Sequence, residues 1–513
     1  MQPNVVIADS SNFRETHSIR WGWLLAYLSV TALSWVIRSG IYTNFMMFLL
    51  SDSGTNLHTD EMVARGLIPT IDFTYFYGPL SILIPRIPFA IGGQTPLVYF
   101  AFQMVCGLLV AINLWRISEI GNWGTIPRLW MLMVLFLIVM PFQAMLLQPL
   151  ELVLLVQSLT EQYRGRRDRA LVWAGLAAMV KPTQGYVVFL VILIWELIDF
   201  KRGIRTRRQT LQTLAFPLVA AITAMTGVIL IFGMRAVWNM QVPLIPTAFY
   251  RDEGFGFFGR IGRQGWDPTM NTFHSYLSSP IGLWLLTTMI VGGAALWLVI
   301  QRPQHPRSID REFLITLGVL SLVGMFVLYG HPPTWKYFSY LPFIGIGMLL
   351  HQFRVWPRLQ VRALILLAVP AMITLILQVN LGITKIQAWT AIPESPGLGD
   401  SSFYVDTWKD LLQQNPEPFL LMESFSPAMV QHRCICADCW SFTTARIFTP
   451  REQQSLRDFS QGRRICFSSI NPPEVMEQIL NQPWMQEILV DRQVIWKSDV
   501  FTLYGLPGEA VPK

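Results

Sequence analysis

The chain has 513 residues, of which 52% are hydrophobic and 14% are charged, whereas soluble domains usually carry about 25% charged residues. The apolar residues fall in blocks of about 18–23, the length that crosses ~30 Å of hydrocarbon, which excludes a soluble globular protein. The net charge of +7 does not indicate a nucleic-acid partner, because residues 1–380 hold 28 Lys/Arg against 17 Asp/Glu and residues 381–513 hold 11 against 15. The basic excess thus belongs to the apolar part, where loop orientation explains it.

The sequence predicts a polytopic α-helical membrane protein with about eleven transmembrane helices. A tail of residues 1–20 precedes a long apolar stretch that we interpret as an uncleaved first span. The predicted transmembrane domain covers residues 21–380, and no internal repeat is apparent in it. Its spans are 21–37 (continuing to about 50), 94–115, 128–145, 148–160, 170–182, 184–199, 211–233, 280–300, 313–330, 338–351 and 362–380.

Basic residues orient these spans. With the N-terminal tail in the cytoplasm, 19 Lys/Arg fall in inner segments and 7 in outer loops. Because cytoplasmic loops carry the excess of Lys and Arg, Lys201–Arg208 is predicted to lie inside. We therefore expect a multi-pass protein of the cell inner (plasma) membrane, with residues 381–513 as an extracytoplasmic domain.

Residues 381–513 are predicted to form a small α/β domain. Helices are expected at Phe403–Gln414 and Pro472–Gln482, the second with prolines in its first turn. The expected strands are Pro418–Glu423 and Arg464–Ser469, followed by a hairpin of Val494–Trp496 and Val500–Tyr504.

Four cysteines lie in this outer region: Cys434, Cys436, Cys439 and Cys466. The C-x-C-x-x-C spacing also occurs in zinc and iron–sulfur sites, but outside the cytosol disulfides are the expectation. We predict two disulfides, and all three pairings remain open. Cys106 lies in a span and is interpreted as a small buried apolar residue.

The first outer loop, residues 51–90, holds the strongest candidates for chemistry. Asp52 directly follows the first span, and Glu61–Leu67 is predicted to form a short interfacial helix on which Asp60 and Glu61 face water. An ordered turn through Asp72 and Tyr77 follows, and a second apolar stretch ends at Arg86. The alternative is a polar loop that happens to be acidic.

The fourth and fifth spans carry polar groups near their outer ends. Gln148 and Glu151 lie at the mouth of the fourth span, and Lys181 lies at the end of the fifth. Ionisable groups in a span cost free energy and usually face a cavity or a partner. The alternative for Lys181 is that its side chain extends to the interface.

The second outer loop, residues 234–279, either gates a substrate or is a plain interfacial loop. Its polar residues are Arg251, Asp252, Glu253, Arg260, Arg263, Asp267 and His274, set among glycines and aromatics. His274 and His331 have no partners at metal-ligand spacing, so we predict no metal site at either.

Together these motifs resemble the GT-C class of membrane glycosyltransferases, which includes the protein O-mannosyltransferase and aminoarabinose transferase types. The layout of residues 20–380 is similar, although Ser53 follows Asp52 where the class has a second acid, and two residues separate Gln148 from Glu151. The matching residues are Asp52, Gly54, Ala64, Arg65, Pro69, Asp72, Phe73, Tyr77, Gly78 and Pro79, then Gln148, Pro149 and Glu151, the Arg164–Arg169 run, Ala174 to Pro182, and Lys336, Tyr337 and Pro342.

The resemblance implies transfer of a hexosyl or pentosyl group from a polyprenyl-phosphate donor, with inversion, to a hydroxyl of a glycan, lipid or protein acceptor outside. An acceptor hydroxyl needs a base, for which Asp52 is the candidate, and a leaving phosphate needs cations. We assign the phosphate to Arg86, Lys181 and Lys336. Asp72, Glu151 and Tyr77 are supporting residues. No cofactor is certain, and whether a divalent cation assists Asp52 stays open.

Two other functions compete with this interpretation. A transporter or lipid flippase would also have many spans and charged groups, but inverted repeats and broken midplane helices are typical of transporters and neither is apparent. A structural membrane anchor for the outer domain leaves the acidic first loop unexplained. A sealed inner half would favour the enzyme, and a path through the membrane would favour transport.

Overall fold

The computed structural model describes the chain in segments. These are residues 20–35, 52–93, 96–137, 147–242, 282–301, 309–324, 340–353, 358, 361–363, 365, 419–422, 448–468, 477, 479–497 and 501–508. Several predicted features lie outside them: the Arg251–His274 part of the second outer loop, His331 and Lys336, the helix at Phe403–Gln414, and Cys434, Cys436 and Cys439.

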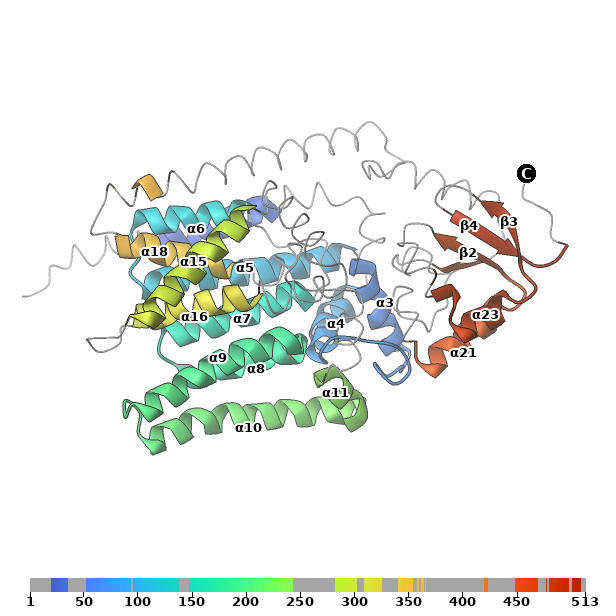
Figure 1. Ribbon diagram of the computed structural model, residues 1–513, viewed down its shortest axis with the longest axis horizontal. Coiled ribbons are helices and arrows are strands. Elements are labelled where there is room, and N and C mark those ends of the chain that lie inside the picture. The colour runs from blue at the N-terminus through green and yellow to red at the C-terminus, as the bar shows by residue number, and fades with distance from the viewer. Residues whose placement is uncertain are drawn as a thin grey trace, which may run out of the picture.

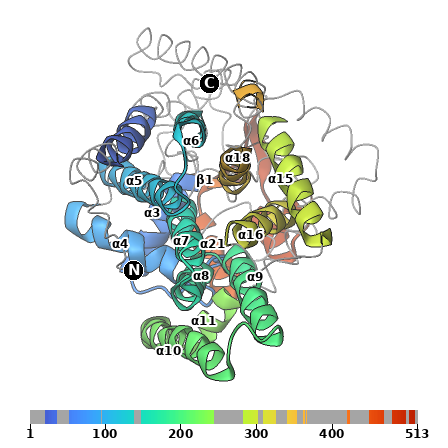
Figure 2. The ribbon, with the colours of Figure 1, turned by 90° about the vertical axis from the view of Figure 1, so that its left-hand side faces the viewer.

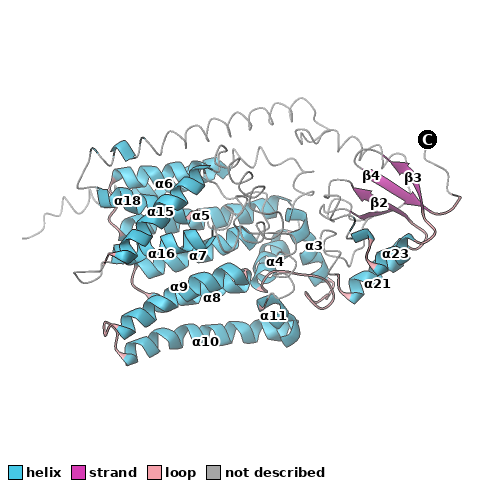
Figure 3. Cartoon of the chain, viewed as in Figure 1, coloured by secondary structure: helices cyan, strands magenta, loops and turns pink. Residues whose placement is uncertain are grey.

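A helix occupies the position of every span predicted between residues 94 and 351 (Figures 1 and 3). Residues 20–35, in the first predicted span, are also helical, whereas most of the last predicted span lies outside the described residues. The helices are α5 (Pro96–Ile120), α6 (Thr125–Leu137), α7 (Leu147–Tyr163), α8 (Arg167–Val180), α9 (Pro182–Lys201), α10 (Arg207–Phe232), α15 (Gly282–Ile300), α16 (Ile309–Val323) and α18 (Leu341–Gln352).

The surface of these helices is suited to lipid. Three described segments are long and apolar enough to cross a membrane: Ala101–Ile120, Pro182–Lys201 and Arg207–Phe232. In α10 only 11% of the apolar stretch is buried, and Leu230 is 81% exposed. Because hiding apolar surface from water contributes about 25 cal/mol per Å², such a helix is stable against lipid tails and not against water. The chain is a helical membrane protein.

The interior of the bundle is built around α7, which packs against α5, α8 and α16 (Figure 2). Tyr163 of α7 stacks on Phe313 of α16 with ring centroids 4.4 Å apart. On the other side of the bundle, the indole N–H of Trp130 donates to the carbonyl oxygen of Phe343 at 2.9 Å, which joins α6 to α18. The buried indole N–H of Trp130 is thus satisfied by a neighbouring helix.

The segment predicted as the first outer loop is more helical than expected. Instead of a short helix at Glu61–Leu67, α3 covers Asp52–Ala64, and α4 covers Leu80–Gly92. α3 ends at Ala64, and Gly66, two residues later, has a left-handed φ of 86°. The amides of Gly66 and Leu67 donate to the carbonyls of Val63 and Met62, the bonding that closes a helix at glycine.

Local sequence also explains the turn between α8 and α9. Lys181 is extended (φ −139°, ψ 101°), and Pro182 begins α9, where a missing amide hydrogen is tolerated. A Cβ on Gly185 would lie 2.0 Å from the amide nitrogen of Ala178. Only glycine therefore allows the two helix ends to approach this closely.

The C-terminal elements form a four-stranded sheet with the order β1-β2-β4-β3. β1 (Phe419–Met422) and β2 (Arg464–Ser468) are parallel, and β4 (Phe501–Gly505) is antiparallel to both β2 and β3 (Gln493–Lys497). The predicted strands and hairpin are confirmed. Two helices, α21 (Pro450–Ser460) and α23 (Pro483–Leu489), were not predicted. We call these strands and helices the C-terminal unit.

The two ends of the bundle differ. Figure 1 shows α3, α4 and a short helix, α11 (Met234–Gln241), at the end that faces the C-terminal unit, here called the loop end. The turns between α7 and α8 and between α9 and α10 lie at the opposite end. Which end faces the cytoplasm stays a prediction.

Candidate active site

The segment from Leu67 to Pro79 makes a compact turn at the loop end. Asp72 accepts a hydrogen bond from the amide of Ile68 at 2.7 Å, and the amide of Thr70 donates to the carbonyl of Phe73 at 2.8 Å. These bonds hold Thr70 at a φ of 65°, which non-glycine residues seldom adopt. Local bonding therefore fixes the path of the turn.

Alternate residues of the next segment form a row of packed aromatic rings. Tyr75 makes edge contacts with Phe73 and Tyr77, with ring centroids 6.2 and 5.6 Å apart. Its hydroxyl lies 2.5 Å from that of Ser81, and burial raises the pKa of Tyr75, so the phenol stays neutral. This row sets the position of Tyr77.

Gly78 joins the loop to the end of α8. Its amide donates to the carbonyl of Val180 at 2.9 Å, and a Cβ at this position would lie 2.1 Å from the carbonyl oxygen of Met179. Only a residue without a side chain permits this approach of two backbones. The contact places the loop directly beside Lys181.

The structure brings together three residues that the sequence predicted: Lys181, Tyr77 and Glu151. The ammonium of Lys181 lies 5.7 Å from the centroid of the Tyr77 ring, and the carboxylate of Glu151 interacts with it electrostatically. Lys181 is only 8% exposed and Glu151 only 1%. A side chain that extends to the interface keeps its charged end in water, so the burial of Lys181 favours a role inside the protein.

Arg86 belongs to the contact between α3 and α4. One of its guanidinium nitrogens lies 3.9 Å from Asp60, and the side chains are 38% and 10% exposed. The prediction that Asp60 faces water is therefore wrong, because α3 turns this residue toward α4. Glu61 is 39% exposed and lies 3.9 Å from His58.

Other predicted site residues are described less fully or not at all. Asp52 begins α3, and its side chain lies outside the described part, as does Lys336. Cys466 is buried in β2, but its predicted disulfide partners are outside the described segments, so the pairing stays a prediction. Among the described residues no group of three His, Cys, Asp or Glu could hold a metal ion.

The sequence did not predict the part played by α11. Gln241 accepts a hydrogen bond from the hydroxyl of Tyr186 at 2.9 Å, and its amide nitrogen would lie 3.2 Å from a Cβ on Gly78. Thr70 donates to the carbonyl of Ala236 at 3.4 Å. α11 therefore supports the loop from one side, and no local motif in the sequence signals this contact.

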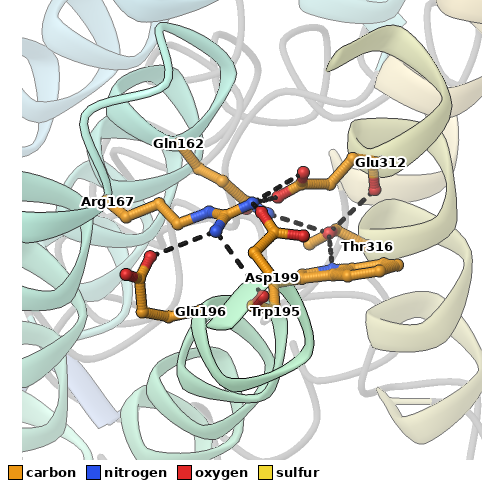
Figure 4. A network of polar contacts seen from close by, with 7 residues as sticks. All are labelled: Gln162, Arg167, Trp195, Glu196, Asp199, Glu312 and Thr316. Atoms are coloured by element: carbon orange, nitrogen blue, oxygen red, sulfur yellow. Dashed lines mark hydrogen bonds and ion pairs between the residues drawn. The ribbon is translucent and has the colours of Figure 1, made fainter. Parts of the chain in front are cut away.

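A second polar centre, at the opposite end, was also missed (Figure 4). Arg167 of α8 contacts Glu196 and Asp199 of α9 at 3.1 and 2.6 Å and Glu312 of α16 at 2.8 Å. Its side chain is 6% exposed. By sequence, Arg167 lies in the basic run between two spans, whereas in the structure its ion pairs connect α8, α9 and α16.

The second polar centre extends through neutral side chains. Gln162 and the indole of Trp195 both donate to the hydroxyl of Thr316 at 2.9 Å (Figure 4). Thr316 in turn donates to the backbone carbonyl of Glu312 at 3.0 Å. α7, α9 and α16 are thereby linked next to the charged groups through side chains that satisfy one another, as buried polar groups require.

Comparison with known proteins yields one structural likeness. No model of a known protein family matches the chain, and no curated protein matches its sequence. Among solved structures, the chain is similar to the crystal structure of ArnT from Cupriavidus metallidurans bound to undecaprenyl phosphate, with 14% sequence identity over 96% of this chain and 99% of that chain and a TM-score of 0.44.

Proposed function

We propose that the chain is a membrane glycosyltransferase that moves a sugar from a polyprenyl-phosphate-linked donor to an acceptor hydroxyl, with inversion. The observation that carries this proposal is the buried Lys181, held at the end of α8 beside Tyr77 and Glu151. A lipid-linked phosphate reaches a protein at the depth of the headgroups, where a span ends. A cation at that depth is suited to such a ligand.

Lys181 would bind the donor phosphate and stabilise the charge that develops on it as the sugar leaves. Hydrogen bonds between an ammonium and a phosphate are charge-assisted and are roughly twice as strong as neutral ones. The aromatic face of Tyr77 orients the ammonium. Arg86, which pairs with Asp60, and Lys336 are assigned to the same phosphate from the sequence alone.

Asp52 would act as the base. The acceptor hydroxyl attacks the anomeric carbon, its proton passes to the carboxylate, and the bond from that carbon to the phosphate oxygen breaks with its electron pair on the phosphate. Direct attack from the opposite face inverts the anomeric centre. Glu151 is a supporting residue that interacts electrostatically with Lys181, and Asp72 supports the site by fixing the loop.

The proposal includes the orientation in the membrane. The loop end and residues 381–513 would face outward from the inner membrane, and Lys201–Arg208 would face the cytoplasm. A cysteine engineered at position 205 should resist an impermeant thiol reagent in intact cells. Labelling there, with protection of a cysteine engineered in the C-terminal unit, would reverse the orientation.

Purified protein in nanodiscs should transfer a radiolabelled hexose or pentose from synthetic polyprenyl-phosphate donors to a glycan, lipid or protein fraction. A chelator arm decides whether a divalent cation takes part. Lys181→Met should lose the transfer, and Lys201→Met, at the far end of α9, should keep it. If the protein instead moves lipid or solute across proteoliposome membranes and transfers no sugar, the result would favour a transporter over a glycosyltransferase.

A further inference from the structure

The C-terminal unit is bonded to the loop that carries Tyr77. α21 begins with a capping box, in which Thr449 accepts from the amide of Glu452 at 3.1 Å and Glu452 accepts from the amide of Thr449 at 2.9 Å. Such a box satisfies backbone donors at a helix start. Here both side chains also reach the loop, which is more than 370 residues away in sequence.

Glu452 makes the central contact. One oxygen of its carboxylate accepts from the amide of Thr74 at 2.9 Å and from the hydroxyl of Thr74 at 2.7 Å. Glu452 is fully buried. A buried carboxylate is destabilising unless hydrogen bonds compensate it, so the cap and the loop contact together keep this charge in place.

Two further contacts fall on Asp72. The hydroxyl of Thr449 donates to the backbone carbonyl of Asp72 at 3.0 Å, and Arg451 pairs with its carboxylate at 2.8 Å. The other carboxylate oxygen of Asp72 accepts a hydrogen bond from the amide of Ile68. The C-terminal unit therefore touches the loop where the turn is built.

A second capping box in the same chain shows that these contacts are not a general feature of the motif. Thr206 and Gln209 cap α10 with the same reciprocal bonds. That box is exposed and stays local. The burial and the long-range bonds of Glu452 are thus specific to α21.

Two of the points at which the loop is held lie only four residues apart. Thr74 is fixed by Glu452 of the C-terminal unit, and Gly78 is fixed by Val180 of the bundle. Tyr77, which faces Lys181, lies between them. The packed rings of Tyr75 and Tyr77 provide a contact through which a displacement at Thr74 would reach Tyr77.

We propose that Thr449, Arg451 and Glu452 are positioning residues with which the C-terminal unit holds the 72–78 loop against the bundle and so completes the phosphate site at Lys181. The contact is read from the structure, and its effect on donor binding rests on the proposed function. The C-terminal unit is then a part of the site and not a passive appendage.

The test measures loop protection and ligand binding separately, on the full-length protein in nanodiscs. Glu452→Gln removes the charge, whereas Thr74→Val removes one loop bond and leaves the cap of α21 intact. Hydrogen exchange of peptides that cover residues 72–78 should rise about tenfold in both variants, because the lost bonds involve a charged group. Binding of polyprenyl phosphate, which involves no sugar transfer, should weaken by about the same factor.

Two variants serve as matched controls. Arg457→Ala breaks a pair within the C-terminal unit, between Arg457 and Glu487 at 2.8 Å, and Thr206→Val breaks the other capping box. Neither should change exchange in residues 72–78. Unchanged exchange in Thr74→Val and Glu452→Gln would overturn the contact, and faster exchange with unchanged binding of polyprenyl phosphate would overturn its role in the site.

If the unmodified protein transfers no sugar, this result would count against the proposed function but not against the loop contact. The exchange measurement would still decide whether the C-terminal unit holds the loop. Arg451→Ala and Arg451→Lys add a graded arm: the lysine variant should retain most of the protection, because it keeps the positive charge next to Asp72. Equal loss in both would contradict the ion-pair contribution.

Discussion

The bundle carries a buried positive charge at each end, and the two are surrounded differently. Arg167 contacts three carboxylates within 3.1 Å, so the four groups sum to a formal charge of −2. Lys181 lies beside one carboxyl group, that of Glu151, and the ring of Tyr77, so this group carries no net negative charge. An excess of negative charge repels a phosphate, whereas an ammonium in a group without net negative charge attracts one.

The difference extends to how each charge is placed. Arg167 presents several N–H donors, and helices α8, α9 and α16 each supply or receive a contact (Figure 4). Lys181 sits at a break between helices, where Gly78 and Gly185 allow backbones to approach closely. We infer that the Arg167 end holds helices together and that the Lys181 end holds a ligand. Substitutions at the two ends should therefore fail in different ways.

The largest effect is expected at Arg167. Arg167→Ala leaves three buried carboxylates without their shared cation, and breaking a buried pair in this way costs about 3–5 kcal/mol. We expect loss of folded protein, measured as the midpoint of thermal unfolding by fluorescence-detected size exclusion. Arg164→Ala is the control, because Arg164 is 31% exposed and, within the described segments, pairs only with Glu161 three residues away, where such pairs contribute roughly 0–1 kcal/mol. Equal unfolding midpoints of the two variants would show that Arg167 and its three carboxylates do not stabilise the fold.

At the loop end, substitution of the proposed base should reduce sugar transfer without lowering the stability of the fold. Asp52→Asn keeps the size of the side chain and removes the base, a loss that typically reduces rates by about 10²–10⁴. Transfer should fall by this amount in the nanodisc assay, with unchanged yield and unfolding midpoint. If Asp52→Asn turns over normally and Asp72→Asn is inactive yet folded, the base is Asp72.

A smaller effect on stability is expected at the glycine that joins the loop to α8. Gly78→Ala forces a Cβ against the carbonyl oxygen of Met179, and overpacking of this kind typically costs about 1–3 kcal/mol. The matched control is Gly175→Ala in α8, where nothing lies within 4 Å of the added Cβ and the change should stabilise the helix by about 0.5–1 kcal/mol. Thermal unfolding in detergent compares the two, and a Gly78→Ala variant as stable as Gly175→Ala would show that the loop does not need this approach.

Local signals in the sequence predicted the helices and strands well. Apolar stretches located α5 to α10, α15, α16 and α18, although Pro182, which begins α9, was placed at the end of the preceding span. The strands β2, β3 and β4 followed from short apolar runs bounded by turn residues. The error at Glu61–Leu67 came from weighing amphipathic spacing above the stop signal of Gly66.

Contacts between distant residues were predicted only in part. Lys181, Tyr77 and Glu151 were grouped because motifs in a fixed order suggested it, not because any spacing required it. The partners of Arg167 lie 29, 32 and 145 residues away, and Glu452 bonds to a residue 378 positions earlier. The capping box of Thr449 is visible in the sequence, but its second use at the loop depends on tertiary structure.

The most direct test of the central claim is the affinity of the purified protein for a synthetic polyprenyl phosphate, measured by native mass spectrometry from nanodiscs. Losing a charge-assisted contact should weaken binding by about 10–100-fold in Lys181→Met. Lys181→Arg should recover part of the affinity, and Lys201→Met should match the unmodified protein. Equal affinities of Lys181→Met and the unmodified protein, with both folded, would contradict the assignment of Lys181 to the donor phosphate.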